Sequence, residues 1–244
     1  MHATGLEGTT DAMLVRDRMT SPAITVDAKT SLDEAQALMR EHDIRRLPVL
    51  QRGRLVGIVT WTDLMRAQPS PASTLSAWEV PSLLRQATVR EIMTSDPITI
   101  GPDAPIEAAA VIMRREKIGG LPVVQDRALL GMITESDIFE AFIDLTGLRQ
   151  GGARLVVDLS GRANAVAGVA SIVDTAGVAL TSLATYRQGD RRLAVIRVDA
   201  AYPLHVVDAL GDAGFPVLHL AAAPGADDVR RPYATYTKAW SQAM

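Results

Sequence analysis

The pattern of apolar and polar positions in the N-terminal part of the chain occurs twice. When residues 15–67 are aligned with residues 89–141, 20 of the 53 pairs are identical and many of the others conserve apolar character. The offset of 74 residues (89 − 15) holds without a gap to the end of the alignment. Such a self-similar stretch is the signature of an internal duplication. We therefore expect two copies of one structural unit.

Each copy predicts the element order β-α-β-β-α, in which a Leu-Pro-Val strand and a third strand are joined by a polar turn. A single unit of about 53 residues buries little surface and is marginally stable alone. We therefore expect the two copies to pack sheet against sheet about a pseudo-twofold axis. The predicted strands are Ile24–Val26, Leu47–Leu50 and Leu55–Thr60 in the first copy, and Ile98–Ile100, Leu121–Val124 and Leu129–Thr134 in the second.

The first helix of each copy has an apolar face. Ser31 is its expected N-cap in the first copy, and Met39 and its counterpart Met113 are expected to fill the core. The second helix of each copy starts near Thr62 or Ser136. The apolar positions of the first helix at helical spacing are Leu32, Ala35, Leu38 and Met39.

A different pattern follows in residues 154–220 and predicts the order βαββαβ, with Gly177 and Gly214 closing the two helices. The fold class is therefore α+β. The expected segments are a flexible N-terminus (1–14), the first copy (15–67), a helical insert or linker (68–88), the second copy (89–146), the βαββαβ domain (154–220) and a loose tail (221–244).

Composition narrows the function. Hydrophobic residues make up 48%, charged residues 22% and aromatic residues 4%, with a net charge of −3. This is ordinary globular composition and gives no support for nucleic-acid binding, which needs a concentrated basic surface. The chain has no cysteine, which excludes disulfides and thiol catalysis. It shows no signal-peptide pattern and no apolar run of membrane-spanning length, so we expect a cytoplasmic protein with no membrane partner.

The start of the second helix in each copy carries the clearest candidate chemistry. Hydroxyl and carboxyl groups recur there at matching positions, and backbone amides at a helix start can hold phosphate oxygens. The alternative is that these side chains only cap the helix. Capping does not require hydroxyls at both positions of both copies, which favours a ligand site. The residues are Thr60, Thr62 and Asp63 in the first copy, and Thr134, Ser136 and Asp137 in the second.

The segments IRRLPVL…GRLVGIVTWTDL and IGGLPVV…RALLGMITESDI resemble the CBS motif, and two such motifs in tandem resemble a Bateman module. The resemblance implies an adenine nucleotide (AMP, ADP, ATP or an S-adenosyl compound) as effector ligand. It also implies that the hydroxyl side chains contact phosphate and that the two aspartates contact ribose.

Arg45 and Arg46 precede the first Leu-Pro-Val strand, at positions that in nucleotide-binding CBS modules supply cations to phosphate. The second copy has Gly119 and Gly120 there. The pseudo-twofold axis predicts that the Asp137 site receives the two arginines and that the Asp63 site receives the two glycines. We therefore expect the Asp137 site to prefer ligands with more phosphate charge. The alternative is a solvated basic edge.

The C-terminal βαββαβ pattern resembles a ferredoxin-like ACT domain, and the whole layout resembles the acetoin-utilisation accessory protein family. Amino-acid-binding ACT domains tend to have Asp-x-x-Gly after the first strand. This chain has Ser160–Asn164 there, with the glycine displaced. We therefore expect this domain to dimerise or to contact a protein partner.

These features predict a regulatory nucleotide sensor that is a homodimer. Ligand occupancy would be passed to the ACT-like domain or to a protein partner. The alternative is a structural or scaffold dimer with empty CBS clefts. An enzyme is not expected because no nucleophile or acid–base pair stands out, and no metal site is expected because His42, His205 and His219 lack ligand spacing.

Overall fold

The computed structural model describes residues 13–67, 87–222 and 234–236. The chain divides into two compact units, Met1–Phe139 and Glu140–Met244, and each is described by itself. Most of the expected N-terminal segment (1–14), helical insert (68–88) and tail (221–244) lies outside the described residues.

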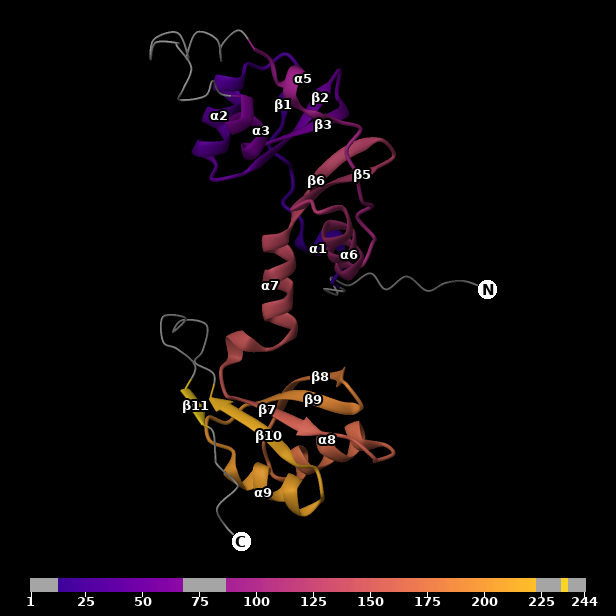
Figure 1. The fold of residues 1–244 in the computed structure, drawn as a ribbon, viewed down its shortest axis with the longest axis vertical. Coiled ribbons are helices and arrows are strands. Elements are labelled where there is room, and N and C mark those ends of the chain that lie inside the picture. Colours follow the sequence, from indigo (N-terminus) through magenta and orange to yellow (C-terminus); the bar gives the residue numbers. More distant parts are fainter. Residues whose placement is uncertain (1–12, 68–86, 223–233, 237–244) are drawn as a thin grey trace, which may run out of the picture. The chain divides into compact units, whose positions relative to one another are not determined.

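The first unit contains both copies of the repeat (Figure 1). The order β-α-β-β-α is confirmed in the first copy, and the second copy has the same order except that its first strand is reduced to a bridge between Ile100 and Val123. The elements are α1 (Val15–Arg18), β1 (Val26–Asp27), α2 (Leu32–Glu41), β2 (Arg46–Gln51), β3 (Arg54–Thr60) and α3 (Trp61–Ala67), then α5 (Val89–Ile92), β4 (Thr94–Ser95), α6 (Ile106–Glu116), β5 (Gly120–Gln125), β6 (Ala128–Thr134) and α7 (Glu135–Leu145).

The sequence explains these elements locally. The Ser31 hydroxyl accepts the Glu34 N–H at 3.2 Å and caps α2, as expected. The side chains of Met39 and Met113 are buried in the apolar interior, also as expected. The Pro48 position in β2 and its counterpart in β5 are tolerated because each strand still pairs with its neighbour through the flanking residues.

The leading segment of each copy pairs with the other copy. Thr20, from the first copy, bridges Met132 of β6, with Thr20 N–H to Met132 O at 2.9 Å and Met132 N–H to Thr20 O at 3.0 Å. Thr94 of β4, from the second copy, lies opposite Ile58 of β3. These two contacts are related by the 74-residue offset. The pseudo-twofold relation is therefore built by a reciprocal exchange of chain segments.

Two glycines allow this exchange. A Cβ added to Gly131 would overlap the Thr20 carbonyl oxygen and lie 3.1 Å from the Met19 sulfur. A Cβ added to its counterpart, Gly57, would lie 2.5 Å from the Met93 sulfur. Glycine is the residue that permits such a close approach of backbone to backbone.

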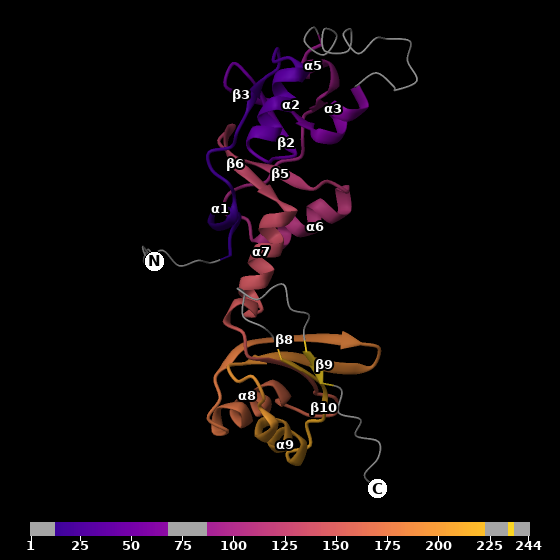
Figure 2. The same cartoon turned by 90° about the vertical axis from the view of Figure 1, so that its left-hand side faces the viewer.

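The second unit is one antiparallel sheet in the order β11-β10-β7-β9-β8. Both helices cover the same face of the sheet (Figure 2), and the core lies between them and that face. The expected βαββαβ order is confirmed. The elements are β7 (Ala153–Asp158), α8 (Ala165–Thr175), β8 (Leu180–Gln188), β9 (Arg191–Val198), α9 (Leu204–Asp212), β10 (Val217–Ala222) and β11 (Ala234–Tyr236).

The strand β11 was not expected. It pairs antiparallel with β10, with Leu220 opposite Tyr236, so the prediction of a loose tail is wrong for residues 234–236. The reason is that β10 would otherwise end the sheet with unpaired backbone groups, which a short added strand satisfies.

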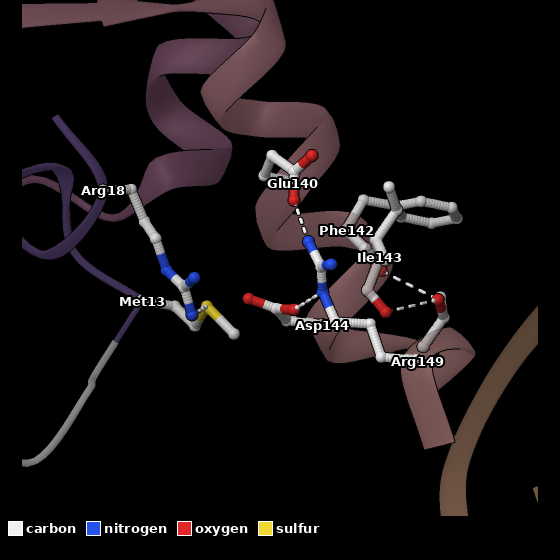
Figure 3. Close-up of polar contacts among 8 residues, drawn as sticks. Met13, Arg18, Glu140, Phe142, Ile143, Asp144 and Arg149 are labelled. Atoms are coloured by element: carbon white, nitrogen blue, oxygen red, sulfur yellow. Dashed lines mark hydrogen bonds and ion pairs between the residues drawn. The ribbon is translucent and has the colours of Figure 1, made fainter. Parts of the chain in front are cut away.

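The chain between α7 and β7 is held by charged and hydroxyl side chains. Arg149 forms ion pairs with Glu140 and, at 2.8 Å, with Asp144 (Figure 3), and the bond to Asp144 together with the charge of Glu140 raises the Arg149 pKa. The carbonyl oxygen of Thr146 accepts hydrogen bonds from the buried Arg197 side chain at 2.9 Å and from the Ser182 hydroxyl at 3.0 Å. These contacts fix the segment 145–147, at the end of α7, against β8 and β9.

Candidate ligand-binding clefts

Two clefts lie in the first unit and are related by the repeat. Cleft A has a volume of about 420 Å³ and cleft B about 1020 Å³, the size range of small-molecule sites. Every residue that lines cleft A has its counterpart 74 residues away in cleft B. The lining of cleft A is Thr20, Ala23, Ile24, Asp43, Ile44, Arg45, Arg46, Gly119, Met132, Thr134, Glu135 and Ser136. The corresponding residues of cleft B are Thr94, Pro97, Ile98, Lys117, Ile118, Gly119, Gly120, Arg45, Ile58, Thr60, Trp61 and Thr62.

Each cleft combines elements of both copies. Cleft A brings the segment before β2 of the first copy against the start of α7 of the second, and cleft B brings the segment before β5 of the second copy against the start of α3 of the first. One wall is apolar, formed by Ile24, Ile44 and Met132 in cleft A. The other carries hydroxyl and charged groups. Such a cleft can hold a ligand that is flat and apolar at one end and anionic at the other.

The aspartates at the helix starts cap those helices. The Asp63 carboxylate accepts the Thr60 N–H at 2.9 Å and the Thr60 hydroxyl at 2.6 Å, while the Thr60 Oγ1 accepts the Asp63 N–H at 3.3 Å. Asp137 accepts the Thr134 N–H at 2.7 Å and its hydroxyl at 2.8 Å. The helices therefore begin one residue earlier than expected, at Trp61 and Glu135. In both copies these bonds go to Oδ2 alone.

Arg46 stands between the two clefts and lines both. Its guanidinium donates to the Gly119 carbonyl oxygen and occupies the space that a Cβ on Gly119 or Gly120 would need. Burial lowers the pKa of Arg46 from its ordinary value and the charge of Arg45 acts in the same direction, whereas Glu135 and Asp137 oppose the shift. The guanidinium remains charged in every case because its ordinary pKa is so high.

The sign of the charge is reversed between the clefts at one equivalent position. Asp43 lines cleft A, and Lys117 occupies the same place in cleft B. The next difference is Glu135 in cleft A against Trp61 in cleft B, although Glu135 also reaches the wall of cleft B. The Trp61 ring is held by the Arg40 guanidinium, which lies 5.5 Å from the ring centroid.

The repeated part of the chain is similar to known proteins. The family model for the CBS domain matches residues 15–70 and 89–144. A CBS domain-containing protein of Dictyostelium discoideum is 36% identical over 133 residues, which cover 54% of this chain and 92% of that protein. The chain belongs to the CBS domain family. Its first unit is a tandem CBS pair.

Another relative of the CBS pair is a segment of an enzyme. The inosine-5′-monophosphate dehydrogenase of Korarchaeum cryptofilum (strain OPF8) is 41% identical over 130 residues, which cover 53% of this chain and 23% of the dehydrogenase. The chain therefore spans less than a quarter of that relative's length, and the similarity concerns the CBS pair.

Three solved CBS structures are similar at the level of sequence. The CBS domain pair of protein MJ0100, in complex with 5′-methylthioadenosine and S-adenosyl-L-methionine, is 34% identical and covers 53% of this chain and 94% of its own, with a TM-score of 0.44. CBSX2 in complex with AMP is 30% identical and covers 53% and 96%, with a TM-score of 0.46. A putative acetoin utilization protein from Vibrio cholerae is 33% identical and covers 56% and 95%, with a TM-score of 0.46.

The CBS pair brings together six of the eight residues expected at the ligand sites. Arg45, Arg46, Thr134 and Ser136 line cleft A, and Thr60 and Thr62 line cleft B with the same two arginines. Asp63 and Asp137 accept hydrogen bonds from Thr60 and Thr134 at the helix starts and are not among the lining residues of either cleft. The repeat predicts the two arginines on the Asp137 side and the two glycines on the Asp63 side. Arg45 and Arg46 line cleft A and both glycines line cleft B, but the arginines line cleft B as well, since the Arg46 side chain lies over Gly119 and Gly120.

Six charged or aromatic lining residues are not among the predicted site residues: Asp43, Trp61, Asp96, Arg114, Lys117 and Glu135. The alignment of the two copies contained a signal for two of them. Asp43 and Lys117 are paired by the 74-residue offset and carry opposite charges, which singles out this position within a well-matched repeat.

Residues 13–67, 87–222 and 234–236 contain no group of three or more His, Asp or Glu side chains placed to hold a metal ion. Over the same ranges, no helix combines the length and apolar character needed to span a membrane.

In the second unit, the loop expected to bind an effector in an ACT domain is filled by its own side chain. Arg162 lies over the Phe215 ring, 4.7 Å from its centroid, and against Gly214. Asp158 accepts the Ser160 N–H at 2.8 Å, and its bonds with the Ser160 hydroxyl and N–H lower the Asp158 pKa.

Proposed function

We propose that the CBS pair is a regulatory module that binds an adenine nucleotide or an S-adenosyl compound in clefts A and B. The observation that carries the proposal is the pair of equivalent clefts, each with a hydroxyl-bearing wall, cationic side chains and an apolar wall. A duplicated site of this composition is what two copies of one ligand-binding unit produce.

The two walls suit the two ends of such a ligand. The adenine ring would lie against the apolar wall, which in cleft B includes Ile58, Ile98 and Ile118. The phosphates would lie near Arg45 and Arg46, because charge-assisted bonds from arginine to phosphate are stronger than neutral ones. Adenosine compounds are also the ligands of the MJ0100 and CBSX2 structures named above.

The aspartates would act from behind the hydroxyl wall. Because Oδ2 of Asp63 and of Asp137 is used in the cap, Oδ1 is the atom that would accept a ribose hydroxyl. A ligand would reach this atom only after the hydroxyl wall opens slightly. The cap and the ribose contact are compatible because a carboxylate accepts several hydrogen bonds.

The second unit is proposed as the receiver of the signal. Its βαββαβ order is that of a ferredoxin-like, ACT-type domain, and the filled loop favours contact with a protein over binding of an amino acid. We expect a homodimer with twofold symmetry, the usual closed form for soluble assemblies. Light scattering at micromolar concentration should give twice the chain mass of 26.1 kDa, and the monomer mass would contradict this expectation.

A thermal-shift screen tests the proposed ligand class. A ligand that binds only the folded state adds about 2.7 kcal/mol at 100 times its Kd. We expect AMP, ADP, ATP or S-adenosyl-L-methionine to raise the melting temperature and guanosine nucleotides to raise it less. If no adenosine compound raises it at millimolar concentration, the CBS pair is a scaffold with empty clefts.

A further inference from the structure

The two clefts differ most clearly in the sign of the charge at one equivalent position, which is Asp43 in cleft A and Lys117 in cleft B. Asp43 and Lys117 are equivalent in the repeat and both have left-handed φ values, 51° and 56°. Lys117 directly follows α6, and His42 separates Asp43 from the end of α2. The following residue in each copy closes the same bond, Ile44 N–H to Met39 O at 2.9 Å and Ile118 N–H to Met113 O at 3.0 Å. The two side chains therefore leave the same backbone and differ in charge.

The rest of the lining increases this difference. Cleft A holds two basic side chains, Arg45 and Arg46, and two acidic ones, Asp43 and Glu135. Cleft B shares the two arginines and Glu135 but has Asp96, Arg114 and Lys117 in addition, which leaves four basic and two acidic side chains. Cleft B is also the larger, at about 1020 Å³ against about 420 Å³.

The basic side chains of cleft B are available to a ligand. Among the described residues, neither Arg114 nor Lys117 forms an ion pair, and both are exposed. The lining of cleft A has two acidic and two basic side chains, whereas that of cleft B has two acidic and four basic ones, so phosphate is attracted less strongly in cleft A. A group of phosphates is favoured where opposite charge exceeds like charge, and an exposed site of this kind is weakened by salt.

We infer that cleft B is the site for adenine ligands with several phosphates, that Lys117 sets this preference, and that cleft A takes adenosyl ligands of low charge. This inference rests on the proposed function and names the ligand class of each cleft. It reverses the expectation from sequence, which assigned the phosphate-rich ligand to the Asp137 side.

Trp61 allows binding in cleft B to be observed separately. It lines cleft B, and its counterpart in the repeat is Glu135. The other two tryptophans of the chain, Trp78 and Trp240, can be replaced by phenylalanine, so that fluorescence reports on Trp61 alone. Calorimetry on the same protein measures total binding.

The experiment compares ATP with adenosine in this background and in two reciprocal variants, Lys117→Asp and Asp43→Lys. We expect ATP to change Trp61 fluorescence at lower concentration than adenosine, with a preference that declines as salt rises. Lys117→Asp should weaken ATP binding in cleft B roughly tenfold and leave adenosine nearly unchanged, because a unit charge is reversed beside the phosphates. Asp43→Lys should add a second ATP-binding event in calorimetry.

Lys117→Gln removes the charge without reversing it and should give an intermediate loss of ATP affinity. An unchanged ratio of ATP to adenosine affinity in both Lys117 variants overturns the inference, as does ATP binding seen by calorimetry with no response of Trp61. These results leave the proposed function standing if adenosine compounds still bind. The absence of all adenosine binding in the unsubstituted protein overturns both.

Discussion

Replacing Gly131 by alanine tests the exchange of segments between the two CBS motifs. The added methyl group would overlap the Thr20 carbonyl oxygen, which is backbone and already accepts the Met132 N–H at 3.0 Å. Overpacking of this kind costs about 1–3 kcal/mol. If the segment moves away, the two hydrogen bonds between Thr20 and Met132 are lost at about 0.5–1.5 kcal/mol each.

The smaller conformational freedom of alanine in the unfolded chain offsets about 0.4–1 kcal/mol of this loss. We therefore expect the Gly131→Ala protein to lose about 1–2 kcal/mol of stability. At about 2–4 °C per kcal/mol, its melting temperature should fall by roughly 2–8 °C, measured by circular dichroism on the full chain.

Two matched glycines make this prediction specific. Gly57→Ala should cost less, because its nearest contact is the flexible Met93 side chain at 2.5 Å. Gly101→Ala should have almost no effect, since nothing lies within 4 Å of the added Cβ. If Gly131→Ala melts at the same temperature as Gly101→Ala, the segment containing Thr20 does not cross to the second copy, and the clefts are built differently.

Two other predictions follow from single side chains. Arg46→Ala should weaken the binding of anionic ligands in both clefts, measured by calorimetry. The fold should survive, because the Gly119 carbonyl oxygen still accepts the Glu135 N–H at 3.2 Å. Weaker binding in one cleft alone would contradict the shared position of Arg46. Glu91 accepts hydrogen bonds from the Thr88 N–H and hydroxyl, and these bonds lower the Glu91 pKa below its value in the unfolded chain. The stability that the bonds add is therefore present at neutral pH and is lost as the pH falls through the pKa of the folded state. Urea denaturation should therefore show that Glu91→Gln is less stable than the unsubstituted protein at pH 7 and that the difference closes in acid; a difference independent of pH would refute this reasoning.

Much of the fold could be predicted because the two copies of the repeat can be aligned with each other. Positions such as Met39 and Met113 stay apolar in both copies, which identifies the buried face of the helix. The pairing partner of the Met-Thr-Ser segment could not be predicted, because its sequence is the same in both copies and fits either β3 or β6. The crossing of the segments is seen only in the structure, where Thr20 pairs with Met132 and Thr94 pairs with Ile58.

The candidate sites were predictable in part for a similar reason. The hydroxyls at Thr60 and Thr134 recur in both copies and line the clefts, as expected. The path of the Arg46 side chain over Gly119 and Gly120 depends on tertiary packing that no local pattern encodes. The opposite charges of Asp43 and Lys117 are visible in the alignment, but the cleft that each side chain lines depends on how the two copies pack together.

Calorimetric titration of ATP and S-adenosyl-L-methionine into the full chain tests the central claim most directly, with Asp63→Ala/Asp137→Ala as the test variant and Ser31→Ala as its matched control. Ser31 caps α2 outside both clefts, so its loss should cost about 1 kcal/mol of stability and leave affinity unchanged. Our account predicts that an adenosine compound binds the unsubstituted protein and the Ser31→Ala protein equally, and binds the doubly substituted protein at least tenfold more weakly while the circular dichroism spectrum is retained. Equal affinity in all three proteins, or no binding in any of them, would contradict it.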